Sequence, residues 1–196
     1  MSFEYWRHYL RGRLFESLGR VDAAAEEYRN AGRLEPSDNH LRNRLGYLMA
    51  RTERWGEAVQ YFSESLRLDP GDAAAWFNLG FAHDKRGQLQ QAAAAFNEAV
   101  RLRPKLDRAW YGMGMALAHL GRHEEAVKAL EEAATLQPMN GHAWYALGMA
   151  HHANHNPDRV REIVEHLLRF DPRMTRQLIL DAQRTDLGHL VKDLVL

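Results

Sequence analysis

Apolar residues recur along this chain at the spacing of helices that pack in pairs. One stripe consists of Trp76, Leu79, Gly80 and His83. A second stripe consists of Ala92, Phe96, Ala99 and Leu102. Because positions three or four residues apart share one face of a helix, the pattern predicts two helices, each with one buried face. Gly87 lies between the two stripes and is expected to end the first helix.

The same pattern repeats every 34 residues without a gap. The tryptophans at this interval are Trp76, Trp110 and Trp144. The glycines are Gly12, Gly46, Gly80, Gly114 and Gly148, and the prolines are Pro36, Pro70, Pro104, Pro138 and Pro172. A fixed period of this length is typical of stacked helical hairpins. We therefore predict hairpins in windows 5–38, 39–72, 73–106, 107–140 and 141–174, followed by a non-repeating tail, 175–196.

Glycine in the middle of each first helix predicts a close approach of the second helix. Glycine costs about 1 kcal/mol relative to alanine inside a helix. We expect bulk on the second helix to fill the space beside it, at Tyr28, Phe62, Phe96, Leu130 and Val164. Gly121 is expected to act as a helix C-cap like Gly87, Asp72 and Asp107 as N-caps, and Asn156-Pro157 as the start of a second helix.

Window 73–106 reads Trp-x-x-Leu-Gly, then alanine, phenylalanine, alanine and a closing proline. This resembles the tetratricopeptide repeat, and the resemblance covers residues 5–174. It implies an all-α fold, a right-handed superhelical solenoid of five hairpins with a C-terminal capping helical segment. It also implies a non-catalytic module for protein–protein interaction. In the first window, His8 and Arg11 replace the tryptophan and leucine of later windows, so we expect a polar end there.

Each first helix carries a second stripe, seen at Ala74, Phe77, Phe81 and Asp84. The resemblance implies that this stripe lines a concave groove that holds the partner. Carried over by position, the groove contains Tyr9, Arg13, Asn43, Tyr47, Phe77, Phe81, Tyr111, Met115, Tyr145 and Met149. Aromatic residues and methionine are typical of surfaces that bury apolar side chains, so we expect a protein or peptide partner with an apolar helix or extended segment. The alternative is that several of these residues only fill the interior of the superhelix.

Chaperone adaptors of this family grip a C-terminal carboxylate with a clamp of lysine and asparagine, which this chain matches only in part. Asn78 and Arg108 occupy clamp-like positions. Asn43 and Tyr47, however, stand where the clamp has lysine and asparagine, and Gly112 replaces a basic residue. The sequence therefore favours an apolar partner segment over a charged C-terminus.

The tail suggests a second functional hypothesis. Leu178, Ile179 and Ala182 are expected to continue the stacking as a cap. Thr185-Asp186 then resembles the start of a helix whose apolar residues are Leu187, Leu190, Val191, Leu194 and Val195. This stripe either folds back on the fifth hairpin or docks on a neighbouring copy, which would make the protein a self-assembling scaffold and a homo-oligomer.

Composition narrows the remaining classes. Lys plus Arg and Asp plus Glu are 26 each, so the chain lacks the basic excess of a nucleic-acid binder. The absence of cysteine excludes disulfides, thiol catalysis and cysteine-based zinc sites. No stretch is apolar enough for membrane insertion and the N-terminus has no secretory signal, so we expect a cytoplasmic protein.

Eleven histidines raise the possibility of a metal site. His151 and His155 are four residues apart on one predicted helix and could share an ion. His151, however, occupies the position held by Phe15, Met49, His83 and Leu117 in other windows, which favours a packed histidine. No catalytic triad, paired-carboxylate pattern or phosphate-binding loop is present. We expect no enzyme activity, no cofactor and no metal.

Overall fold

The computed structural model describes residues 2–192, and within that range it contains helices and no strand. The helices are α1 (Phe3–Ser17), α2 (Val21–Leu34), α3 (Asn39–Arg51), α4 (Trp55–Leu68), α5 (Ala73–Lys85), α6 (Leu89–Leu102), α7 (Asp107–His119), α8 (His123–Leu136), α9 (Gly141–Ala153), α10 (Pro157–Leu167), α11 (Pro172–Asp181) and the 3-10 helix η1 (Thr185–Val191). The predicted all-α class is confirmed.

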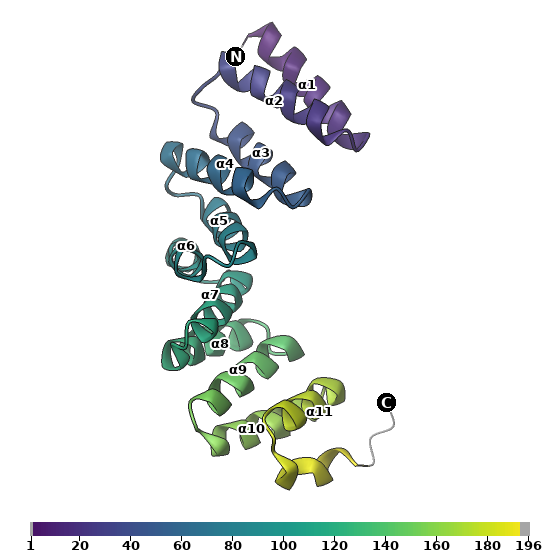
Figure 1. Cartoon of the computed structure of the whole chain (residues 1–196), viewed down its shortest axis with the longest axis vertical. Helices are drawn as coiled ribbons and strands as arrows, with labels where there is room; N and C mark the ends of the chain where they lie inside the picture. Colours follow the sequence, from purple (N-terminus) through teal and green to yellow (C-terminus); the bar gives the residue numbers. More distant parts are fainter. Residues whose placement is uncertain (1, 193–196) are drawn as a thin grey trace. The chain divides into compact units, whose positions relative to one another are not determined.

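The helices α1 to α10 pair into five successive hairpins (Figure 1). The helices α3, α5, α7 and α9 begin at the first residue of their predicted windows, while α1 begins earlier, at Phe3. The chain divides into two compact units, which are described separately. The first unit runs to Leu102 and contains α1 to α6, and the second begins at Arg103 and contains the remaining helices.

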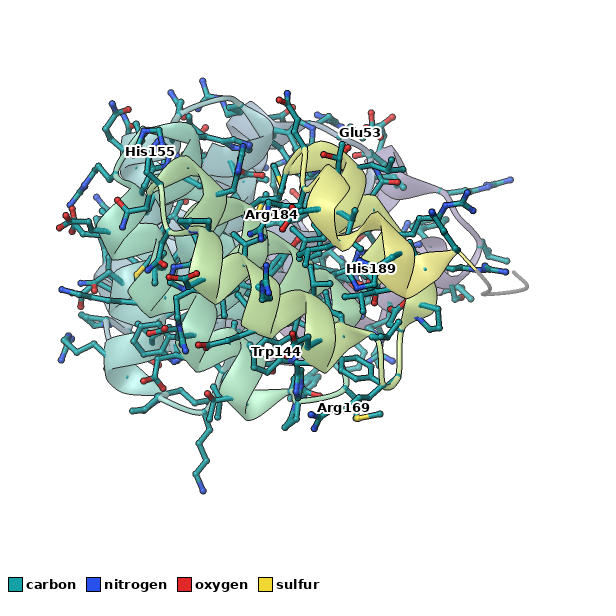
Figure 2. All side chains as sticks on the ribbon, turned by 90° about the horizontal axis from the view of Figure 1, so that it is seen from below. Glu53, Trp144, His155, Arg169, Arg184 and His189 are labelled. Atoms are coloured by element: carbon teal, nitrogen blue, oxygen red, sulfur yellow. The ribbon has the colours of Figure 1, made fainter. Side chains whose placement is uncertain are left out.

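Each hairpin turns at a residue in the left-handed conformation. The predicted C-caps are confirmed at Gly87, with φ 70°, and at Gly121, with φ 74°. The second and fifth hairpins place Glu53 (φ 58°) and His155 (φ 54°) at the equivalent position, and both residues are labelled in Figure 2. A side chain with a Cβ atom is strained there, so these two turns are less favourable than the glycine turns.

Side chains cap the predicted helix starts in two of the three cases. Asp72 accepts hydrogen bonds from the backbone N–H groups of Ala74 and Ala75, at 2.9 and 3.0 Å. Asn156 accepts one from Arg159 N–H at 3.4 Å. The prediction for Asp107 is wrong, because Asp107 is the first residue of α7 and the cap residue before it makes no side-chain bond. Its carboxylate still favours the positive end of the helix dipole.

The conserved-interval glycines do admit a bulky side chain of the packed helix. In the first unit, a Cβ atom built on Gly46 would lie 2.7 Å from the Phe62 ring. In the second unit, a Cβ atom on Gly114 would lie 2.5 Å from Leu130. The expected partner of Gly148, Val164, is wrong as the nearest group. The side chain over Gly148 is Leu178 of α11, at 2.6 Å, because valine is too short to fill this space.

Tryptophan and proline share the period because they are bonded to each other. The indole Nε1–H of each repeated tryptophan donates to the carbonyl oxygen of the proline that ends the preceding window. The pairs are Trp76 to Pro70 (2.9 Å), Trp110 to Pro104 (2.8 Å) and Trp144 to Pro138 (2.9 Å). Each bond ties the start of a first helix to the loop before it.

The expectation of a polar first end is wrong. His8 points toward α2, where its Nδ1 lies 2.6 Å from Glu27 Oε2, and Arg11 pairs with the same carboxylate at 2.9 Å. The outward-facing side chains occupy other positions and are apolar: Phe3, Trp6, Leu10, Leu14 and Leu18. The polar substitutions therefore lie beside α2, and a large apolar surface stays exposed.

The tail closes the fifth hairpin. Leu178, Ile179 and Ala182 are buried, which confirms their role as a cap. The segment after them forms the 3-10 helix η1, in which Leu187 is 3% exposed. This burial favours the interpretation that the stripe folds back on its own chain. Leu190 and Val191 are half-buried, and Leu194 lies outside the described residues.

A single arginine anchors this tail. Arg184, labelled in Figure 2, donates from Nη1 to the carbonyl oxygen of Pro157 at 2.5 Å and from Nη2 to Asp186 at 2.8 Å. Arg161 of α10 lies 3.4 Å from the same Asp186 carboxylate. The start of η1 is thereby bonded to α10.

Candidate functional site

Four of the predicted groove residues line one cleft of the second unit. The cleft measures about 290 Å³ and lies among α7, α8 and α9. Tyr111 and Met115 are four residues apart on α7, and Tyr145 and Met149 are four residues apart on α9, so each pair shares a helix face. The other lining residues are Ala118, His119, His123, Ala146, Ala150 and Ala153. The alanines leave the space that the larger side chains border.

The two tyrosines of the cleft are held in their neutral form. The Tyr145 hydroxyl donates to Asp181 Oδ2 at 2.6 Å, which together with burial raises the pKa of Tyr145 to about 12. The same bond, with one from Gln177, lowers the pKa of the Asp181 carboxyl. Burial raises the pKa of Tyr111. The cleft therefore presents phenol rings and thioethers rather than charge.

Sequence reasoning missed the two histidines of this cleft. His119 ends α7 and His123 begins α8, on either side of the turn at Gly121. The Nδ1 atom of His123 is buried and has no hydrogen-bond partner among the described residues. An unpaired buried nitrogen costs free energy that a bound polar group would recover. Their position beside the Gly121 turn was the available signal, because a hairpin turn brings both helix ends together.

In the first unit, two of the predicted residues are exposed. Tyr47 is 54% exposed and Phe81 is 40% exposed. The Trp55 ring packs edge-on against Phe81 with 5.8 Å between ring centroids, and Lys85 Nζ lies 5.2 Å from the centre of the same ring. Trp55 and Lys85 were not predicted. They extend the apolar surface around Phe81 and give it one positive charge.

Other predicted groove residues are engaged within the fold. The Phe77 ring packs on Phe96, at 5.8 Å between centroids, and Asn43 Nδ2 donates to Asp72 at 3.1 Å. Tyr9 stacks on Tyr5 at 6.0 Å. For these three, packing within the hairpins accounts for the observed contacts. Arg13 and Arg108 are exposed and Asn78 is half-buried. Asn78 and Arg108 belong to different units.

The histidines of α9 do not form a cluster. His151 is 5% exposed, and its two ring nitrogens have no hydrogen-bond partner within residues 2–192. Burial lowers the pKa of His151, so the ring is neutral and packed, as its position in the repeat predicted. Among the described residues, no three His, Asp or Glu side chains gather as metal ligands would. No described helix combines the length and apolar content of a membrane span.

Comparison with known proteins places this geometry among relatives. Family models described as "Tetratricopeptide repeat" match residues 9–73, 57–107, 77–138 and 117–180. The comparison with curated proteins gave no match.

Several solved structures share the fold at low sequence identity. A MamA protein is 19% identical with a TM-score of 0.80, and the match covers 100% of this chain and 99% of that one. YrrB, described as "a TPR protein with an unusual peptide-binding site", is 22% identical with a TM-score of 0.79 and 90% coverage of both chains. A tetratricopeptide repeat protein from Parabacteroides merdae is 17% identical with a TM-score of 0.80, covering 98% of this chain and 78% of that one.

Proposed function

Since the chain belongs to the tetratricopeptide-repeat family, we propose that it binds an apolar helix or extended segment of a partner protein in the cleft among α7, α8 and α9. In this proposal the protein has no chemistry of its own. It acts as an adaptor, scaffold or assembly factor in the cytoplasm.

One observation carries the proposal. The two tyrosine–methionine pairs, predicted from the repeat register alone, border a single cleft of about 290 Å³. This volume is near the lower end of ligand pockets and accommodates one or two apolar side chains. Tyrosine rings are rigid anchors, and the methionine thioether adapts to different shapes. The description of YrrB as peptide-binding supports the same class of ligand by analogy.

The chemistry of the cleft restricts the partner further. Both tyrosines are neutral and Asp181 already accepts the Tyr145 hydroxyl, so a charged side chain would lose hydration without gaining an ion pair. An apolar side chain of the partner loses no such hydration. A backbone amide beside it would pair with Nδ1 of His123. We therefore expect leucine, isoleucine, methionine or phenylalanine at the contact.

A selection from a displayed library of random peptides tests this function. The wild type is compared with Met149→Glu, which puts a carboxylate in the cleft. Met139→Glu is the matched control, because Met139 is 72% exposed in the turn before α9. We expect the wild type and the Met139 variant to enrich the same apolar peptides and the Met149 variant to lose them. The thermal melt followed by circular dichroism should be equal in all three.

Two outcomes would contradict the proposal. Equal enrichment by the Met149 variant removes the cleft from binding, and enrichment of charged peptides without apolar residues removes the ligand class. Phe81→Glu in the same selection tests the exposed surface of the first unit separately.

The alternative function, a scaffold that assembles through its tail, has less support. Leu187 is packed within its own chain and is not available at the surface. Light scattering of the full chain at tens of micromolar tests this alternative. A monomer contradicts it.

A further inference from the structure

The outer face of α1 is an apolar surface that no described part of the chain covers. Its side chains follow one another at intervals of three or four residues, which makes a continuous ridge along the helix. The exposed fractions are 80% for Phe3, 47% for Trp6, 61% for Leu10, 57% for Leu14 and 61% for Leu18. With full areas of about 180–250 Å² for such residues, roughly 500–600 Å² is exposed, which is the upper range for a monomer and often marks a functional patch.

The repeat itself shows what this face does elsewhere in the first unit. A shift of 34 residues carries Leu10 to Arg44 and Leu14 to Leu48 of α3. Leu48 is fully buried in the core shared by the first two hairpins. Arg44 Nε donates to Tyr28 Oη at 2.8 Å and to Glu16 Oε2 at 3.0 Å, both in the preceding hairpin. The face is therefore built for packing against helices, and in α1, at the end of the unit in Figure 1, it is unoccupied.

Charge around the ridge discriminates between occupants. Arg7 lies three residues before Leu10, and Arg13 lies three residues after it, so both flank the ridge. Arg13 has no acidic partner among the described residues, and the one carboxylate exposed on α1 beside the ridge, Glu4, already pairs with Arg7 at 2.5 Å. A second copy docked through the same face would bring these arginines against their own equivalents, and such like-charge contacts cost several kcal/mol.

The opposite end of the chain does not match the ridge either. On α11, the exposed surface of the described residues carries one large apolar side chain, Leu180, among Arg173, Arg176 and Gln177. A head-to-tail stack of copies would therefore set the leucines of α1 against polar groups.

We propose that the ridge of α1 is a docking site for an amphipathic helix of another protein, whose apolar stripe is flanked by glutamate or aspartate. The apolar residues of that helix fill the place that the preceding hairpin fills for α3. Its carboxylates pair with Arg7 and Arg13. This site is independent of the cleft proposed above and shares no residue with it.

Fluorescence anisotropy with two labelled synthetic helices tests the proposal. Each probe has about 18 residues, to match the length of α1, with leucine at every third or fourth position. One probe carries glutamate beside the leucines and the other carries lysine. We expect the glutamate probe to bind the full chain at least about tenfold more tightly than the lysine probe, with affinity that falls as salt is added.

Matched variants locate the binding. The double variant Leu10→Gln/Leu14→Gln should weaken the glutamate probe at least about tenfold. The control Leu68→Gln/Leu180→Gln changes leucines that are 43% and 62% exposed on α4 and α11 and should leave binding unchanged. Arg13→Glu should reduce the preference for the glutamate probe.

Three results would overturn the proposal. The first is equal affinity for the two probes, and the second is binding that the α1 double variant does not weaken or no binding of either probe. The third is a wild-type dimer in sedimentation equilibrium that the Leu10→Gln/Leu14→Gln variant converts to a monomer, which would assign the face to a second copy of this chain.

Discussion

Replacing Gly80 by alanine tests whether the periodic glycines are required by close packing. A Cβ atom at Gly80 would lie 2.8 Å from Cδ1 and 2.9 Å from Cε1 of Phe96. Carbon atoms in contact normally lie about 3.5–4.0 Å apart. Phe96 is 2% exposed, so its ring has no free space into which it can turn. The ring or the helix must therefore shift.

The expected magnitude combines two opposing effects. Overpacking of a buried site costs about 1–3 kcal/mol. Alanine in place of glycine inside a helix contributes about 1 kcal/mol in the other direction. We expect Gly80→Ala to lower the free energy of unfolding by about 1 kcal/mol, and by up to about 2 kcal/mol where the ring cannot relax. Urea unfolding followed by circular dichroism, with midpoint and slope both compared, measures the change.

A second background turns the test into a change of sign. In a Phe96→Ala protein the ring is gone, so Gly80→Ala should raise stability by up to about 1 kcal/mol. The control is Gly56→Ala, because a Cβ atom at Gly56 meets nothing within 4 Å. If Gly80→Ala stabilises the wild type as much as it stabilises the Phe96→Ala protein, the close approach to Phe96 is not why this position holds glycine.

Three further variants test other elements of the fold. His151→Leu should abolish a loss of stability below about pH 6.5: the folded-state pKa of His151 is lowered by burial, so protons bind the unfolded chain first as the pH falls, and urea midpoints at two pH values show the difference. An unchanged pH dependence would contradict this assignment. His155→Gly should stabilise by about 0.5–1 kcal/mol because φ is 54° there, and a lower thermal midpoint would refute the strain. Trp110→Phe should cost about 0.5–1.5 kcal/mol through the lost bond to Pro104, and an unfolding free energy equal to that of the wild type would show that this bond is dispensable.

Much of the fold was predictable because the repeat is a packing rule. Gly80 and Phe96 occupy fixed positions in their window, and the close contact between them follows from that register. The pair Tyr145 and Met149 was predictable for the same reason, since both positions share a helix face with their equivalents in other windows. Periodicity predicts which side chains face which neighbour wherever a neighbour exists.

The pattern failed where the neighbour differs from the repeat. Leu14 occupies a position that is buried in α3, and its exposure follows from the absence of a packed helix on that side rather than from its own identity. At the other end, Leu178 of the non-repeating α11 displaces Val164 as the group over Gly148. His123 joined the cleft through a turn, which lies outside the stripe that was followed along each helix.

Methyl-labelled methionine gives the most direct test of the proposed binding cleft. In a protein carrying ¹³C in its methionine methyl groups, Met115 and Met149 report from the cleft, while buried Met49 and exposed Met139 serve as internal controls. Addition of a peptide selected for its apolar residues should shift the NMR signals of Met115 and Met149 in a saturable way and leave those of Met49 and Met139 in place. Saturable binding of that peptide without a shift at Met115 or Met149 would contradict the account.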